Sequence, residues 1–182
     1  MKAWAERLSK IGIVRTFDYD YMRKGGRRPD SPAMLVGRHR EALREARMDD
    51  AQPVFLIGKS MGGRIGCHVA LEELVTGLVC LGYPLCGGGD PKRLRDKVLR
   101  DLRTPILFVQ GTRDPLCPID LLESVRAEMK ASNFLHLVEG GDHSLLVTKT
   151  QLRSAGKTQD QVDECVLNVI AQFVGRLCET PR

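Results

Sequence analysis

Three separate segments of the sequence contain the residue types of a serine nucleophile and of the groups that activate one. GKSMGG carries a G-x-S-x-G pattern around Ser60, GTRDP contains Asp114, and EGGDHS contains His143. A serine hydroxyl is a poor nucleophile until a histidine takes its proton, and that histidine needs an acid to fix its tautomer. Ser60, His143 and Asp114 are therefore the candidate nucleophile, base and acid.

The glycines around Ser60 suit a sharp turn between a strand and a helix. An apolar run at 54–57 precedes the motif, and a helical pattern follows it. On such a turn the serine stands at the helix N-terminus, and its neighbours on both sides must lack side chains for the backbone to close up. The bare pattern also arises by chance, so its placement after an apolar strand is the more specific signal.

Each candidate also has a purely structural interpretation. Ser60 can cap a helix at an ordinary turn, Asp114 can be a turn residue, and Asp142 competes with Asp114 as the neighbour of His143. We expect Cys117, close to Asp114 in sequence, to be buried. The remaining histidines fall within helix or strand patterns, where structural roles are expected: His39, His68 and His136.

Alternating strand and helix patterns position these candidates. Short apolar runs predict strands at 13–18, 54–57, 78–81, 105–110 and 134–138. Helical spacing predicts helices at 32–47 with Ser31 as N-cap, at 61–74, at 92–100, at 118–129 and along 162–177.

Strands joined by helices pair in parallel through right-handed crossovers, which gives a mostly parallel sheet with helices on both faces. The length of 182 residues suits one domain, so we expect 1–182 to form a single α/β domain, a three-layer αβα sandwich. Such sheets bind ligands at the carboxyl ends of their strands. Ser60, Asp114 and His143 each follow a predicted strand, in the order Ser, Asp, His expected of this architecture.

Composition excludes several other classes of protein. With 42% hydrophobic and 28% charged residues, the chain can form an apolar core and is not expected to be disordered. The net charge of +5 comes from basic residues interspersed with acidic ones, and only 5% of residues are aromatic, so nucleic acid is not an expected partner. No membrane span and no secretory signal are evident, which predicts an intracellular, cytoplasmic protein. The six cysteines form no C-x-x-C pair, and we expect neither a metal nor a cofactor.

GKSMGG, GTRDPLCP and GGDHSL together resemble the α/β-hydrolase superfamily, most closely its dienelactone-hydrolase-like branch. Within that branch, the chain is similar to the small hydrolase-like proteins grouped with testis-expressed protein 30 and subunit 3 of the non-specific-lethal complex. FDYDYMRKGGRRPD takes part in this similarity, which runs over most of the chain. The resemblance implies Ser60 as nucleophile, Asp114 as acid, His143 as base, and an oxyanion hole built partly from the backbone N–H of Met61.

One departure from the hydrolase pattern concerns the start of the chain. Hydrolases of this kind begin with further strands and an H-G-x-G-like loop that donates the second oxyanion N–H, and neither precedes the segment at 13–18. We therefore expect either that the sequence is a truncated form, or that the strands at 13–18 and 54–57 meet directly.

Together these observations predict a serine hydrolase that acts on an ester or related acyl bond of a small-molecule substrate through an acyl-enzyme intermediate. The alternative is a catalytically weak or inactive hydrolase-fold module that binds a protein partner, which the missing oxyanion loop favours.

Overall fold

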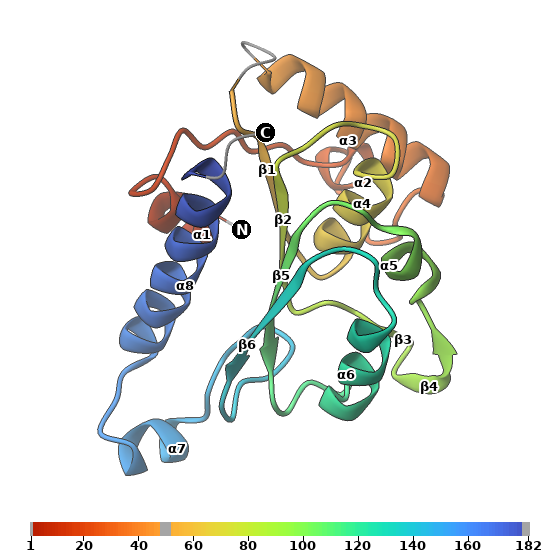
Figure 1. Cartoon of the computed structure of the whole chain (residues 1–182). Coiled ribbons are helices and arrows are strands. Elements are labelled where there is room, and N and C mark those ends of the chain that lie inside the picture. Colours follow the sequence, from red (N-terminus) through yellow and green to blue (C-terminus); the bar gives the residue numbers. More distant parts are fainter. Residues whose placement is uncertain (1, 48–51, 180–182) are drawn as a thin grey trace.

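A sheet of four parallel strands forms the centre of the fold in a computed structural model, which describes residues 2–47 and 52–179 (Figure 1). Its spatial order is β1 (Phe55–Lys59), β2 (Gly77–Leu81), β5 (Ile106–Gly111) and β6 (Asn133–Val138). All three pairings are parallel. These strands agree with four of the sequence predictions to within one or two residues at each end.

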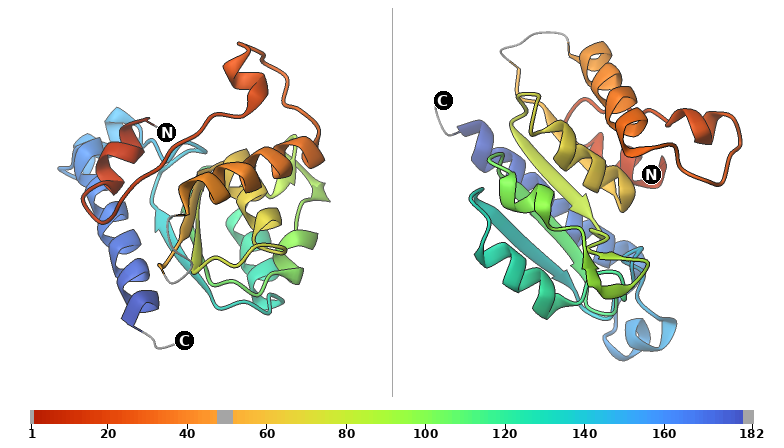
Figure 2. Two further views of the ribbon diagram at one scale, coloured as in Figure 1. Left: turned by 90° about the horizontal axis from the view of Figure 1, so that it is seen from above. Right: turned by 90° about the vertical axis from the view of Figure 1, so that its right-hand side faces the viewer.

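Helices cover both faces of the sheet. One face packs against α3 (Pro32–Ala46), α4 (Met61–Val69), α5 (Lys97–Asp101) and α6 (Ile119–Ala127). The other face is covered by α1 (Lys2–Leu8) and the long α8 (Gln159–Glu179), as Figure 2 shows from two further directions. The short α2 (Asp20–Arg23) and α7 (Lys149–Ser154) lie in the connections. The predicted α/β class, a three-layer αβα sandwich with a parallel sheet, is confirmed.

The hydrophobic core has two parts, one on each face of the sheet. Every residue of β2 and β5 is buried, because these strands are central and covered on both faces. Ile65 and Phe108 belong to the cluster beneath α3 to α6, whereas Leu107 and Ile170 belong to the cluster beneath α8. The apolar stripe predicted along 162–177 is the face of α8 that forms this second cluster.

The strand predicted at 13–18 is wrong. Residues 13–19 form an irregular segment, and among the described strands β1 pairs with β2 alone. Val14 packs in the cluster beneath α8, whereas Phe17 and Tyr19 pack in the cluster on the opposite face, and Ile13 is 83% exposed. The segment therefore passes from one face of the sheet to the other, which keeps it from running alongside a neighbouring strand. For the same reason, the expectation that the strands at 13–18 and 54–57 meet directly is also wrong.

The helix predicted at 92–100 is only partly correct. Its first three residues belong to β4 (Asp90–Leu94), which pairs antiparallel with β3 (Cys86–Gly87), and the helix α5 begins at Lys97. Gly88 and Gly89 have φ values of 67° and 78°, a conformation that allows the chain to reverse here. The helix predicted at 61–74 likewise ends earlier, at Val69. Among the described residues, no helix combines the length and the apolar character that crossing a membrane requires.

Candidate active site

Ser60 lies at a strained turn between β1 and α4. Its φ of 51° and ψ of −121° fall outside the regions that residues with a side chain ordinarily adopt. Such strain persists only where the surrounding structure imposes it, and it gathers at functional sites. Here the backbone N–H of Ser60 donates to the carbonyl of Leu81 at the end of β2. The turn thus presents the serine at the carboxyl edge of the sheet.

The glycines that this turn requires differ in part from those expected. A Cβ on Gly58 would lie 2.3 Å from the backbone nitrogen of Gly63, and a Cβ on Gly63 would lie 2.8 Å from the carbonyl oxygen of Gly58. Gly62, which completes the G-x-S-x-G pattern, has open space where its Cβ would be. The close approach between strand and helix therefore depends on Gly58 and Gly63, and the expected requirement at Gly62 is wrong.

Ser60, His143 and Asp114 form one continuous chain of hydrogen bonds. The Nε2 atom of His143 lies 2.7 Å from the Oγ of Ser60, and its Nδ1 lies 2.7 Å from the Oδ2 of Asp114. A carboxylate oxygen accepts hydrogen bonds, so Nδ1 carries the imidazole proton and Nε2 is left to accept from the serine hydroxyl. The structure thus brings all three candidates together in the arrangement that general-base activation of a serine requires.

Asp114 is held by two further hydrogen bonds. Its Oδ1 accepts from the backbone N–H of Leu116 at 2.8 Å, and its Oδ2 accepts from the side-chain amide of Gln110 at 2.6 Å. Gln110 is fully buried at the end of β5, and its Oε1 accepts from the backbone N–H of Tyr83. Sequence analysis missed Gln110, although a polar residue at the end of an apolar strand was a visible signal.

Asp142, the competing carboxylate, has a different role. Its Oδ1 accepts from the backbone N–H groups of Ser144 and Leu146, so that it shapes the loop that carries His143. The hydroxyl of Ser144 accepts a hydrogen bond of 2.9 Å from the ammonium of Lys59, beside Ser60. This contact ties the histidine loop to the serine turn.

The N-terminus of α4 provides hydrogen-bond donors beside Ser60. Met61 is the first residue of this helix, where backbone N–H groups have no intrahelical acceptor. No acceptor for the N–H of Met61 is found in the part of the chain that the structure describes. This donor is available to an oxygen bound at Ser60, as an oxyanion hole requires.

Other groups that could act as nucleophiles, bases or ligands lie elsewhere or are held neutral. Cys117 is fully buried, and this burial, followed by the charge of Asp114, raises the pKa of its thiol to about 12. His39, His68 and His136 lie in α3, α4 and β6, as expected. Within residues 2–47 and 52–179 no cluster of three or more potential metal-ligating side chains occurs.

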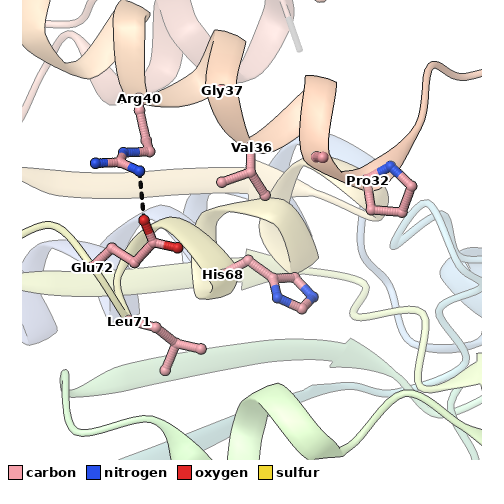
Figure 3. Close-up of a pocket in the computed structure, with 8 residues that line it drawn as sticks. Pro32, Val36, Gly37, Arg40, His68, Leu71 and Glu72 are labelled. Carbon is pink, nitrogen blue, oxygen red and sulfur yellow. Dashed lines mark hydrogen bonds and ion pairs between the residues drawn. The ribbon is translucent and has the colours of Figure 1, made fainter.

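A separate hollow of about 380 Å³ lies between α3 and the C-terminal end of α4. Pro32, Val36 and Arg40 line it from α3, and His68 lines it from α4 (Figure 3). The guanidinium of Arg40 is bound to the carboxylate of Glu72 at one end of the hollow. Neither Ser60 nor its hydrogen-bonded partners line this hollow, so it is distinct from the candidate active site.

Solved structures of several hydrolases share this fold. A dienelactone hydrolase from Anabaena variabilis superposes with a TM-score of 0.62 and 18% identity, over 97% of this chain and 76% of that one. An alpha-beta serine hydrolase homologue from Coxiella burnetii gives a TM-score of 0.57 at 20% identity, over 85% of this chain and 72% of that one. Est1E from Butyrivibrio proteoclasticus gives 0.58 at 15% identity, over 83% and 72%.

The sequence itself supports the same assignment over nearly its whole length. Residues 1–175 match the family described as alpha/beta hydrolase domain. The strand order, the turn at Ser60 and the loops at the carboxyl edge fit that match. The chain therefore belongs to the alpha/beta hydrolase domain family.

Proposed function

We propose that this protein is a serine hydrolase that cleaves an ester or related acyl bond, with Ser60 as nucleophile, His143 as base and Asp114 as the acid that orients it. The observation that carries the proposal is the pair of 2.7 Å contacts that link the three side chains through the two ring nitrogens of His143. The strained backbone of Ser60 is a second, independent support, because it has the form of a nucleophile elbow.

In the first half of the reaction, the Oγ of Ser60 attacks the acyl carbon while Nε2 of His143 takes the hydroxyl proton. The tetrahedral intermediate collapses as His143 returns that proton to the leaving alcohol, which gives an acyl–Ser60 ester. A water molecule then attacks this ester and gives its proton to His143, and the proton passes back to Ser60 as the carboxylic acid leaves. One ester and one water become one acid and one alcohol.

The negative charge of each intermediate develops on the carbonyl oxygen of the substrate, and preorganised N–H donors stabilise it. The N–H of Met61, which has no acceptor among the described residues and lies at the positive end of the α4 dipole, is the proposed donor.

We further infer that the chain forms a single domain over 1–182 and belongs to the dienelactone-hydrolase-like branch, with the small hydrolase-like proteins related to testis-expressed protein 30. The motifs GKSMGG, GTRDPLCP and GGDHSL support this grouping. The dienelactone hydrolase and the serine hydrolase homologue among the structural neighbours support a small-molecule acyl substrate.

Labelling with a fluorophosphonate probe tests the proposal directly. We expect the wild-type chain to form a covalent adduct at Ser60, seen as a mass increase by intact mass spectrometry, and to hydrolyse 4-nitrophenyl acetate. Ser60→Ala should lose both properties. Ser124→Ala, which removes an exposed serine from α6, is the matched control and should retain both. A folded wild-type protein without labelling would favour the non-catalytic module instead.

A further inference from the structure

Arg64 is a half-buried arginine for which the described part of the chain supplies no hydrogen-bond acceptor and no carboxylate. Its Nε is buried without a partner, and neither terminal nitrogen takes part in a hydrogen bond or ion pair there. Burying even part of a guanidinium without an acceptor costs free energy, because water is removed from its charge and its donors. A group with this much unused donor capacity therefore calls for a separate explanation.

Two other arginines, Arg38 and Arg47, also have a buried Nε, but their terminal nitrogens form contacts within the protein. The Nη1 of Arg38 reaches the carboxylates of Glu41 and Glu45, and the Nη2 of Arg47 donates to the carbonyl of Leu74. Both of these side chains thus use their terminal nitrogens within the protein. Arg64 differs, because neither its Nε nor its terminal nitrogens have an acceptor among the residues that the structure describes.

A second arginine reinforces the positive charge around Arg64. Burial first, and then the nearby charge of Arg95, lowers the pKa of Arg64. The side chain of Arg95 has one long contact, 3.5 Å from its Nη1 to the carbonyl of Pro84, and no carboxylate within ion-pair distance among the residues described. The phenol groups of Tyr19 and Tyr83 also lie within electrostatic reach of Arg64. Two cations that have no ion-pair partner among the described residues create a local positive potential that favours an anion.

The position of Arg64 places this potential beside the reactive serine. Arg64 lies one turn along α4 from Ser60, and its backbone N–H donates to the carbonyl of Ser60. Four residues of helix span about 6 Å along the axis. Tyr83 and Arg95 approach the same region from the connection that follows β2. An acyl chain of about four methylene groups attached at Ser60 matches this span along the helix axis.

We propose that Arg64 and Arg95 form a subsite for a carboxylate carried by the acyl part of the substrate, a few carbons from the bond that is cleaved. The proposal rests on the proposed function of Ser60, and it narrows the substrates from acyl esters in general to monoesters of dicarboxylic acids. Arg64 contributes charge-assisted hydrogen bonds to the carboxylate, and Arg95 adds to the positive potential.

Two esters matched in length test the proposal. Mono-4-nitrophenyl adipate and 4-nitrophenyl hexanoate have the same leaving group and differ only in a carboxylate or a methyl group at the far end of the chain. We expect wild-type kcat/KM, after subtraction of the Ser60→Ala blank, to be at least about tenfold higher for the adipate ester, the scale of one charge-assisted hydrogen bond.

The same two esters show which residue causes the preference for the adipate ester. Arg64→Ala should lower kcat/KM for the adipate ester between about 10- and 100-fold, while hydrolysis of the hexanoate ester changes by no more than a few-fold. Arg95→Ala should lower the adipate preference in the same direction. Arg103→Ala removes an equal charge from an exposed position at the opposite edge of the sheet, before β5, and should leave the preference unchanged.

Failure of the subsite and failure of the catalytic proposal give different results. If hexanoate hydrolysis depends on Ser60 but Arg64→Ala affects both esters equally or neither, the subsite is wrong and the serine hydrolase proposal stands. If neither ester is hydrolysed above the blank, the catalytic proposal is wrong. Calorimetric titration of monomethyl adipate into the Ser60→Ala protein then decides on the subsite alone: binding that disappears with Arg64→Ala supports it, and no binding overturns it.

Discussion

Asp114 shows how closely single residues define the candidate site. Both of its oxygens accept hydrogen bonds, and its side chain is fully buried, so it has one geometry in which to meet His143. Asp142, one residue before His143, accepts from backbone N–H groups instead. The two carboxylates compete in the sequence but have separate tasks in the structure: one faces the imidazole, and the other shapes its loop.

Because the two carboxylates have different partners, the same aspartate-to-asparagine change should affect ester turnover very differently at Asp114 and at Asp142. Asp114→Asn presents an amide that stabilises the wrong imidazole tautomer, so ester turnover should fall on the order of 10,000-fold, as it does when this change is made in a catalytic triad. Asp142→Asn keeps an Oδ1 that accepts from the same N–H groups, so turnover should change only a few-fold. Steady-state kinetics with 4-nitrophenyl acetate measures both. A larger loss at Asp142 would make it the partner of the histidine.

Gln110 is predicted to position Asp114 rather than to touch substrate. Gln110→Leu removes the donor to Asp114 and leaves the buried N–H of Tyr83 without its acceptor. We expect a loss of about 1–3 kcal/mol in the free energy of unfolding and a fall in kcat between about 10- and 100-fold from the misplaced carboxylate. Urea denaturation and kinetics measure the two effects. The idea is wrong if stability falls while kcat is unchanged.

At the scale of elements, the sequence predicted those parts whose hydrophobic pattern is local. The strands β1, β2, β5 and β6 each contain a short apolar run, and the helix α8 displays a helical period in its own residues. The segment at 13–18 has strand-like composition, but a strand also needs a neighbour, which no local pattern reveals. At 92–94 the helical spacing predicted a helix, but the chain reverses at Gly88 and Gly89 and this stretch pairs with β3 instead.

The candidate site was predictable for a related reason. Its three side chains follow strands, and parallel strands end at one edge of a sheet. Gln110, Arg64 and Gly63 were not predicted, because their roles depend on contacts between elements. Only the packed structure shows that Gly63 meets Gly58, or that Arg64 lies without a counter-ion among the described residues.

The packing of α4 on β1 gives a prediction for two adjacent glycines. A Cβ at Gly63 would lie 2.8 Å from the carbonyl oxygen of Gly58 and 3.0 Å from the Sγ of Cys80, so Gly63→Ala must displace the helix and should cost about 1–3 kcal/mol of stability. Gly62→Ala meets open space within the same helix and should instead stabilise by about 0.5–1 kcal/mol. Urea denaturation of both variants measures the difference. Equal effects at the two positions would contradict the packing argument.

At the scale of the whole molecule, the segment at 13–19 connects the two halves of the core. It begins beside α8 and ends against α3, where Tyr19 shares a hydrogen bond of 3.2 Å with the Nδ1 of His39. The ring of Phe17 packs against the same imidazole, with centroids 4.9 Å apart. His39 is 8% exposed, and burial lowers its pKa to about 4. The attachment of the N-terminal segment to α3 thus depends on a neutral histidine.

A neutral buried histidine makes global stability depend on pH. In the unfolded chain, the imidazole titrates near its reference pKa of about 6.5. As pH falls below that value, the unfolded state takes up a proton that the native state excludes until the pH approaches about 4. The contribution of His39 is therefore complete above pH 6.5 and is lost as the pH falls toward 4, by about 3 kcal/mol at most.

His39→Gln isolates this effect, because the glutamine amide can still hydrogen-bond to Tyr19 but does not titrate. Carboxylates lower the stability of both proteins in acid, so the informative quantity is the difference between them, measured by urea denaturation at steps between pH 7 and pH 4.5. Wild-type stability should fall more steeply than that of the variant over this range. His136→Gln removes a half-buried imidazole from β6 and should reduce the pH dependence of stability less than His39→Gln does. Parallel profiles for wild type and His39→Gln would show that His39 accepts a proton within the native fold, and the predicted link between its burial and acid sensitivity would be wrong.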